Sequence, residues 1–205
     1  MNDTETKNTA VKAPALMSTR PVTAQDALDQ CEKLSPMMVH YCQTKTGLTD
    51  PANTILFYRL GDFYEMFFED ATLVSKELEL TLTGKDCGME ERAPMCGIPY
   101  HAAEGYINRL VENGHKVAIC EQMEDPKQAK GMVKREVIRV VTPGTTLIPQ
   151  GLDETKNNYI MSIVCMEGCF GISTADISTG QCLVTEMDKP RRLVDEITKF
   201  MPAEI

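Results

Sequence analysis

The chain of 205 residues, 42% hydrophobic and 25% charged, is long enough for one large or two small domains and has an ordinary globular composition. Its net charge is −9, and acidic residues outnumber basic ones in residues 1–34, 35–145 and 146–205 alike. This balance excludes a domain that binds duplex DNA strongly by itself, but it is compatible with one arm of a larger clamp. The longest nearly apolar run, Tyr159 to Met166, is too short to span a bilayer and the N-terminus is no secretory signal, so we expect a cytoplasmic protein with reduced cysteines.

The elements of the first part follow from local pattern. Residues 1–34 are expected to be a tail, disordered or partly helical, because residues 1 to about 22 show no apolar periodicity. Ser35 as N-cap and Pro36 at the first helical position predict a helix that ends near Gly47. Alternating patterns then predict, in chain order, strands at 54–60 and 63–67, a helix at 70–80, a loop at 84–93, a strand at 94–98, a helix at 102–113, a strand at 116–122, a short basic helix at 125–130 and a strand at 135–142.

Strands that alternate with helices predict an α/β domain around a mixed sheet over residues 35–144. Residues 145–157 are rich in turn formers and predict a linker. The pattern beyond it predicts a β-β-β-α unit, with strands at 158–165, 170–177 and 181–186 and a helix at 190–201. Because such a unit is an incomplete domain that another strand would continue, we expect the sequence to be part of a longer protein.

The segment that points most directly to a function is the run FYRLGDFYEMF at residues 57–67. In an extended segment Phe63 and Glu65 point to one side and Tyr64 to the other, and Gly61 permits a sharp turn that presents that side to a partner. A ring beside a carboxylate suits a site that wedges into a base stack and tests one base edge by a hydrogen bond. The competing interpretation places Phe63 in the core and makes Glu65 an ordinary exposed strand residue.

Four separated motifs follow one another in the chain: FYRLGDFYEMF, PMCGIPYH at residues 94–101, VAICEQ at residues 117–122 and RVVTPGT at residues 139–145. In order and spacing they resemble the mismatch-binding domain of the MutS family, over roughly residues 35–145. The later run DISTG at residues 176–180 resembles the start of the connector domain that follows in that family. The resemblance therefore implies an α/β fold: a mixed-sheet mismatch-binding domain at 35–144, then the first part of a ribonuclease-H-like connector domain, truncated, at 158–205.

The resemblance implies roles for two residues of the first motif. Phe63 would stack on the mispaired or unpaired base from the minor groove, and Glu65 would form a hydrogen bond with that base. The implied function is recognition of mispaired or unpaired bases in duplex DNA at the start of mismatch repair. The alternative is a non-catalytic DNA-processing or protein-interaction module of a MutS relative that does not sense mismatches.

The resemblance also implies properties of a longer parent protein. That parent would be a bacterial ATPase that uses ATP and magnesium, forms a dimer around DNA and recruits a MutL-type protein; it would be cytoplasmic and associated with the nucleoid when on DNA. The G-x-x-x-x-G-K-[ST] phosphate loop is absent from this sequence, since the step Gly84-Lys85 has Glu79 where the first glycine is needed. We therefore expect this chain to be a monomer with no enzyme activity, cofactor or membrane contact of its own.

Basic residues near the motifs are candidate contacts to the DNA backbone. Five of them lie within thirteen residues that contain one acid, Glu136, and a sixth lies in the first motif. The set comprises Arg59, Lys127, Lys130, Lys134, Arg135 and Arg139. The alternatives are a solvated helix and strand edge for the five, and a structural ion pair with Asp62 for Arg59.

Other chemistry has less support in the sequence. His40 and Cys42 are close, but the histidines and cysteines do not combine at a zinc spacing, so no metal is expected. Asp176 and Asp188 could supply a carboxylate pair, which defines a rival hypothesis of a small metal-dependent nuclease. A second rival is a protein-interaction scaffold in which Phe63 merely packs.

Overall fold

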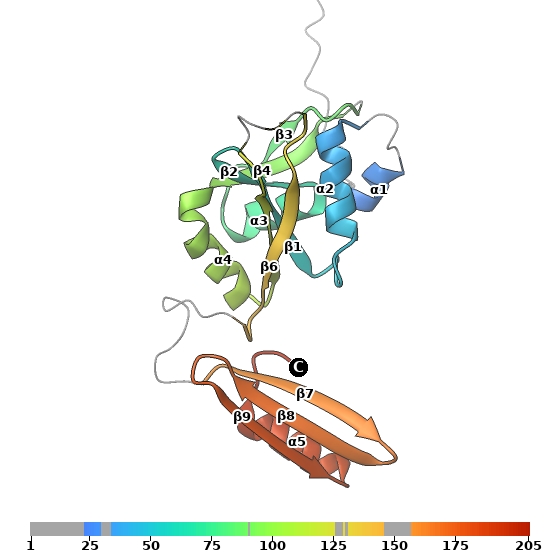
Figure 1. Cartoon of the computed structure of the whole chain (residues 1–205), viewed down its shortest axis with the longest axis vertical. Coiled ribbons are helices and arrows are strands. Elements are labelled where there is room, and N and C mark those ends of the chain that lie inside the picture. Colours follow the sequence, from blue (N-terminus) through green and yellow to red (C-terminus); the bar gives the residue numbers. More distant parts are fainter. Residues whose placement is uncertain (1–22, 30–33, 90, 126–128, 130, 146–156) are drawn as a thin grey trace, which may run out of the picture.

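The computed structural model describes residues 23–29, 34–89, 91–125, 129, 131–145 and 157–205 (Figure 1). It confirms the expected class, a mixed six-stranded sheet with helices followed by a three-stranded antiparallel sheet with one helix. In chain order the elements are α1 (Ala24–Leu28), α2 (Pro36–Thr46), β1 (Thr54–Leu60), β2 (Phe63–Phe67), α3 (Phe68–Glu77), β3 (Thr83–Lys85), β4 (Ala93–Pro99), the 3-10 helix η2 (Tyr100–Ala102), α4 (Ala103–Glu112), β5 (Lys116–Gln122), β6 (Arg135–Val141), β7 (Tyr159–Met166), β8 (Cys169–Asp176), β9 (Gln181–Met187) and α5 (Pro190–Phe200).

The six-stranded sheet has the order β3-β4-β2-β1-β5-β6. β1 and β5 run parallel, and the other neighbouring pairs are antiparallel. The first five residues of β1, TILFY, are all buried, as expected for an apolar run in an interior strand covered on both faces. β2 is paired on both sides, by β1 and β4, so any side chain that it exposes lies on a face of the sheet and not on its edge.

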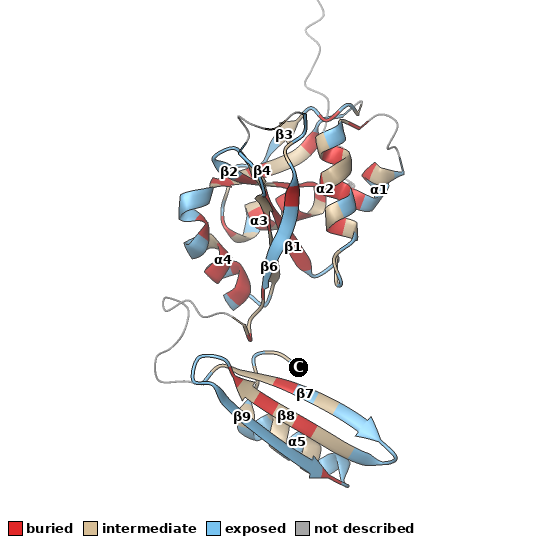
Figure 2. Ribbon diagram, in the orientation of Figure 1, coloured by how far each residue is buried: buried red, intermediate tan, exposed pale blue. Residues whose placement is uncertain are grey.

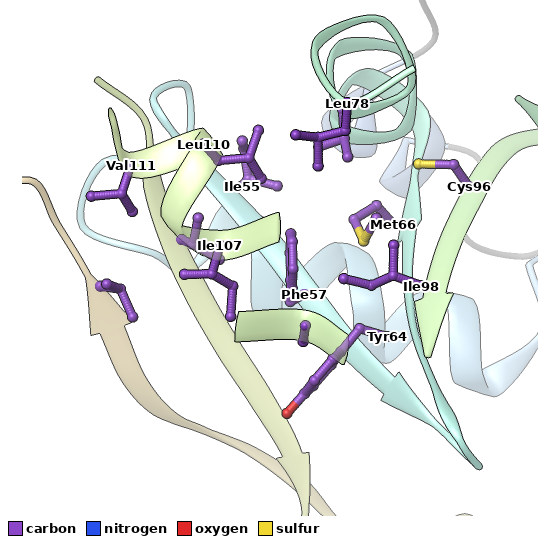
Figure 3. Close-up of a cluster of buried hydrophobic side chains, with 14 of the residues drawn as sticks. Ile55, Phe57, Tyr64, Met66, Leu78, Cys96, Ile98, Ile107, Leu110 and Val111 are labelled. Carbon is purple, nitrogen blue, oxygen red and sulfur yellow. The ribbon is translucent and has the colours of Figure 1, made fainter. Parts of the chain in front are cut away.

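Side-chain alternation divides the core between the two faces of this sheet. The first face packs against α3 and α4 (Figure 3), and its buried cluster includes Ile55, Phe57, Tyr64, Met66, Ile98, Leu110 and Val117. The second face packs against α1 and α2, and its buried cluster includes Ala24, Ala27, Met38, Tyr41, Leu56, Tyr58 and Phe67. Across the β1–β2 pair, Phe63 lies opposite Leu60 and Glu65 opposite Tyr58. Directly paired residues share a face, so Phe63 and Glu65 both belong to the α2 face.

β3 and the start of α3 differ from the predicted elements. β3 falls where a loop was predicted, because its three residues, TGK, are polar and become a strand only by pairing with β4. α3 begins at Phe68 and not at Asp70. Phe68 has a φ of +54°, an uncommon conformation for a side chain of its size, which ends β2 sharply while its ring is fully buried.

The segment expected to be a tail contributes a short helix to the core. The side chain of Thr23 accepts from Asp26 N, and the side chain of Asp26 accepts from Thr23 N, forming a capping box that starts α1. Ala24 and Ala27 are buried in the same cluster as Met38 and Tyr41 of α2. Residues 1–22 and most of the basic helix expected at 125–130 lie outside the described residues.

A buried ion pair joins α2 to α3. Lys45 Nζ lies 2.6 Å from Asp70 Oδ1 and donates to Thr54 O at 2.7 Å, while Asp70 Oδ2 accepts from Leu56 N at 2.8 Å. The two side chains are only 3% and 6% exposed. Burial raises the pKa of Asp70 to about 6, although the Lys45 ammonium acts in the opposite direction. Because each buried charge is both paired and hydrogen-bonded, the pair fixes α2 and α3 to the middle of β1.

The second unit consists of β7, β8 and β9 in that order, with α5 against the sheet. Its core is small, with Met161, Ile172 and Met187 buried and side chains of α5 partly buried against them. β9 is exposed along most of its length (Figure 2). After α5, where a further strand is expected, Glu204 forms one isolated parallel bridge with Ile160. Within the described parts of both units, no helix is long and apolar enough to cross a membrane.

Candidate nucleic-acid interface

Phe63 and Glu65 lie at the open end of the α2 face. Phe63 is 46% exposed, and the side chain of Glu65 is 17% exposed. Tyr64 between them points into the opposite cluster, as the strand periodicity predicts. Further along β2, Phe67 is fully buried with its ring centroid 4.8 Å from that of Tyr41 in α2. On this face β2 is therefore exposed at its start, where the ring of Phe63 lies, and covered at its end.

The turn that precedes Phe63 is held at both of its carbonyl groups. Gly61 has a φ of +57°, which glycine adopts without strain. Gly61 O accepts a hydrogen bond from Arg59 Nε at 2.6 Å, and Asp62 O accepts one from Tyr100 N at 2.9 Å. The guanidinium of Arg59 stacks on the ring of Tyr100, 3.7 Å from its centroid. Two of the sequence motifs therefore meet at this turn and fix where Phe63 begins.

A third motif joins the same cluster through Glu121 of β5. Glu121 Oε1 accepts from Tyr64 Oη and lies 3.3 Å from Arg59 Nη1. Burial, and then the hydrogen bond to Glu121, raise the pKa of Tyr64 to about 12, so the phenol stays a neutral donor at physiological pH. The ion pair of Arg59 is with Glu121 and not with Asp62, the alternative considered from the sequence, because β5 lies beside β1 and brings Glu121 to the guanidinium.

Glu65 has a charged neighbour that sequence reasoning missed. Lys85 Nζ in β3 lies 2.5 Å from Glu65 Oε2 and 5.5 Å from the centroid of the Phe67 ring. Between the two strands, β4 places Gly97 opposite Glu65. A Cβ built at Gly97 would lie 3.3 Å from Tyr64 O, a tight approach, and 3.5 Å from Glu65 Cγ, an ordinary contact, so a side chain there would press first on the backbone of β2. Gly84 and Lys85 fall within the loop expected at 84–93, so the sequence does not predict a contact between Lys85 and Glu65.

The other expected backbone contacts differ in how free their charges are. Lys134 is exposed and pairs with Glu136 at 2.6 Å, and Arg139 is exposed on β6. Arg135 is buried, donates from Nε to Arg59 O at 2.8 Å, and lies with its guanidinium 5.2 Å from the centroid of the Tyr58 ring. Lys127 and Lys130 lie outside the described residues.

The carboxylates of the nuclease hypothesis are not brought together. Asp176 ends β8 opposite Gln181, whereas Asp188 follows the other end of β9. Asp176 Oδ1 accepts from Ser178 N at 2.9 Å and Ser178 Oγ at 2.6 Å, and these bonds lower the pKa of Asp176. Its carboxylate caps the turn between two strands. Among the described residues no group of three or more His, Cys, Asp or Glu side chains could hold a metal ion.

Comparison with known families agrees with the motifs. The family model of MutS domain I matches residues 35–149, and that of MutS domain II matches residues 158–205. Proteins named DNA mismatch repair protein MutS are 65% identical over 173 residues in Lachnoclostridium phytofermentans, 57% over 175 in Acetivibrio thermocellus and 55% over 175 in Alkaliphilus metalliredigens. These alignments cover 84% of this chain but 18 to 20% of the relatives, so the chain spans about a fifth of their length. The resemblance seen in the four motifs is thereby confirmed, and the chain belongs to the MutS family.

Proposed function

We propose that this chain recognises mispaired or unpaired bases in duplex DNA at the start of mismatch repair. The observation that carries the proposal is the ring of Phe63, left 46% exposed at the end of a braced strand and sharing its face with the carboxylate of Glu65. The printed names of the relatives, DNA mismatch repair protein MutS, support the same role. A ring that is exposed on an interior strand adds little to the core, and its position next to a fixed turn suits contact with a ligand.

In the proposed mechanism Phe63 inserts between base pairs. Partial unstacking costs a few kcal/mol, and the cost is smallest where pairing is already defective. Glu65 then accepts a hydrogen bond from a base that lacks its normal partner. Near a perfect duplex the carboxylate meets phosphates and no free donor, so it penalises matched DNA. Preference for a mismatch thus arises largely from weak binding elsewhere, which fits a chain whose net charge is −9.

We further propose that basic residues hold the DNA backbone on either side of this contact. Lys134 and Arg139 are exposed and suited to phosphate, and Lys127 and Lys130 belong to the same basic segment. Arg59 and Arg135 remain in the proposed set, but their internal hydrogen bonds leave only some of the guanidinium N–H groups for phosphate.

The two matched domains carry no catalytic role in this proposal, and chemistry is assigned to a longer protein. In such a protein we propose an ATPase that uses ATP and magnesium, a second subunit that completes a clamp around DNA, and a MutL-type partner. For this protein we propose a cytoplasmic location, with the nucleoid as its place when it is on DNA. The 205-residue chain alone is proposed to be a monomer.

The proposal is tested by duplex binding in a chain extended to the length of these relatives. Duplexes with one G·T mismatch or one unpaired T are compared with matched duplex at low and moderate salt. Phe63→Ala is expected to abolish the preference for the defect, and Glu65→Ala to relax it, mainly through tighter binding to matched duplex. Val184→Ala and Glu186→Ala change an equally apolar and an equally acidic exposed residue of β9 and serve as controls. If Phe63→Ala and Glu65→Ala discriminate as well as the unmodified protein, the function is not mismatch recognition through this site.

A further inference from the structure

The proposed site contains a charge that the mechanism above does not use. Lys85 is held in place by two contacts, the 2.5 Å approach of its ammonium to Glu65 Oε2 and the 5.5 Å approach to the ring of Phe67. Phe67 is itself fully buried beside Tyr41. A lysine whose ammonium is engaged by both a carboxylate and a ring loses less freedom when it orients a partner than a solvated one does.

The contact with Lys85 engages only one of the two oxygens of the Glu65 carboxylate. Oε2 faces the Lys85 ammonium, whereas Oε1 makes no hydrogen bond with any described residue. A carboxylate fixed through one oxygen presents the other in a defined direction, which a free glutamate on a strand does not.

We propose that Lys85 is a positioning and specificity-determining residue, which holds Glu65 through Oε2 so that Oε1 is presented to the hydrogen-bond donor of an unpaired or mispaired base. This inference rests on the proposed function of Glu65 and adds its regulation by a neighbouring strand. The β3 edge strand therefore serves recognition by bringing this lysine to the interior strand β2.

The competing role for Lys85 is a plain phosphate contact, since its side chain is 32% exposed. The two roles differ in what they depend on. A phosphate contact strengthens matched and mismatched duplex alike, acts independently of Glu65, and contributes about one unit to the slope of log affinity against log salt. A positioning contact acts only while Glu65 carries its carboxylate, and it acts on the preference for the defect.

The experiment is a double-mutant cycle of Lys85→Met and Glu65→Gln in the full-length chain, with binding to G·T and matched duplexes at two salt concentrations. Lys85→Met should lower the preference for the mismatch roughly two- to fivefold, the range expected for a partly exposed ion pair. In the Glu65→Gln background it should change the preference by less than about 1.5-fold, because no carboxylate remains to be positioned. Lys85→Arg should keep most of the preference, and Lys76→Met, on exposed α3 surface, should change nothing.

The remaining outcomes would overturn either the role of Lys85 or the proposed function itself. Equal losses on both duplexes that persist with Gln at position 65, together with a salt slope reduced by about one, would make Lys85 a phosphate contact and overturn the inference. An unchanged preference in Lys85→Met would overturn it too, provided thermal unfolding shows the variant folded. If Phe63→Ala and Glu65→Gln themselves leave the preference intact, the proposed function fails first, and that result is separate from the behaviour of Lys85.

Discussion

Substitution of Lys45 by Met tests whether the buried ion pair holds the first unit together. The change keeps the length and apolar stem of the side chain but removes the ammonium that lies 2.6 Å from Asp70 Oδ1. Asp70, whose side chain is only 6% exposed, then keeps its hydrogen bond from Leu56 N but has no opposite charge. Removal of one partner from a buried pair costs about 3–5 kcal/mol. A domain of this kind has only about 5–15 kcal/mol of stability, so the expected loss is a large share of it.

The assay is urea unfolding of the 205-residue chain, followed by far-UV circular dichroism because the sequence has no Trp. With a slope of about 2 kcal/mol per M, a loss of about 4 kcal/mol lowers the midpoint by about 2 M. The double variant Lys45→Met with Asp70→Asn should be more stable than Lys45→Met alone, because Asn is uncharged and still offers an acceptor to Leu56 N. Lys134→Met, which breaks an exposed pair with Glu136, is the control and should not move the midpoint.

Two results would refute this reasoning. One is a loss below about 1 kcal/mol in Lys45→Met, which would mean that water or rearrangement satisfies the Asp70 carboxylate. The other is strict additivity in the double variant. If Lys45→Met leaves the Asp70 charge unpaired, then neutralising that charge by Asp70→Asn should recover part of the lost stability. Either would show that packing of α2 and α3, and not the ion pair, fixes these helices to β1.

Three further outcomes are expected. The pKa of Asp70 is raised to about 6, so the folded state holds this proton more tightly than the unfolded state does. The contribution of Asp70 to stability is therefore most favourable below about pH 4 and is lost as pH rises through about 6. Asp70→Asn should make the urea midpoint depend less on pH over this range. Gly61→Ala, at φ +57°, should destabilise by about 1 kcal/mol in urea unfolding, whereas Gly105→Ala in open space on α4 should stabilise slightly; equal effects would contradict the role of the turn. Tyr100→Ala removes the ring that lies 3.7 Å from the Arg59 guanidinium and should lower mismatch preference, while Tyr100→Phe keeps the ring and should not; an equal loss in both would point to the hydroxyl instead.

Much of the first unit was predictable because its signals are local. The apolar run of β1, the Ser35-Pro36 start of α2 and the period of α4 all depend on neighbours a few residues away, and the structure has these elements within about two residues of the expected bounds. The placement of Phe63 and Tyr64 on opposite faces follows from the period of two once β2 is a strand, whereas the exposure of Phe63 was left open by the sequence. These features required no knowledge of which strands are neighbours.

The partner of each polar group at the site was not predictable in the same way. Arg59 contacts Glu121 and not the nearby Asp62, Glu65 contacts Lys85 in a strand predicted as loop, and Lys45 reaches Asp70. These contacts depend on the sheet order β3-β4-β2-β1-β5-β6 and on which face each helix covers. Local pattern therefore determined most of the elements and that Phe63 and Glu65 share a face. The tertiary structure decided that this face is open at Phe63 and which groups contact the two side chains, because charges far apart in sequence become neighbours only when the strands between them are paired.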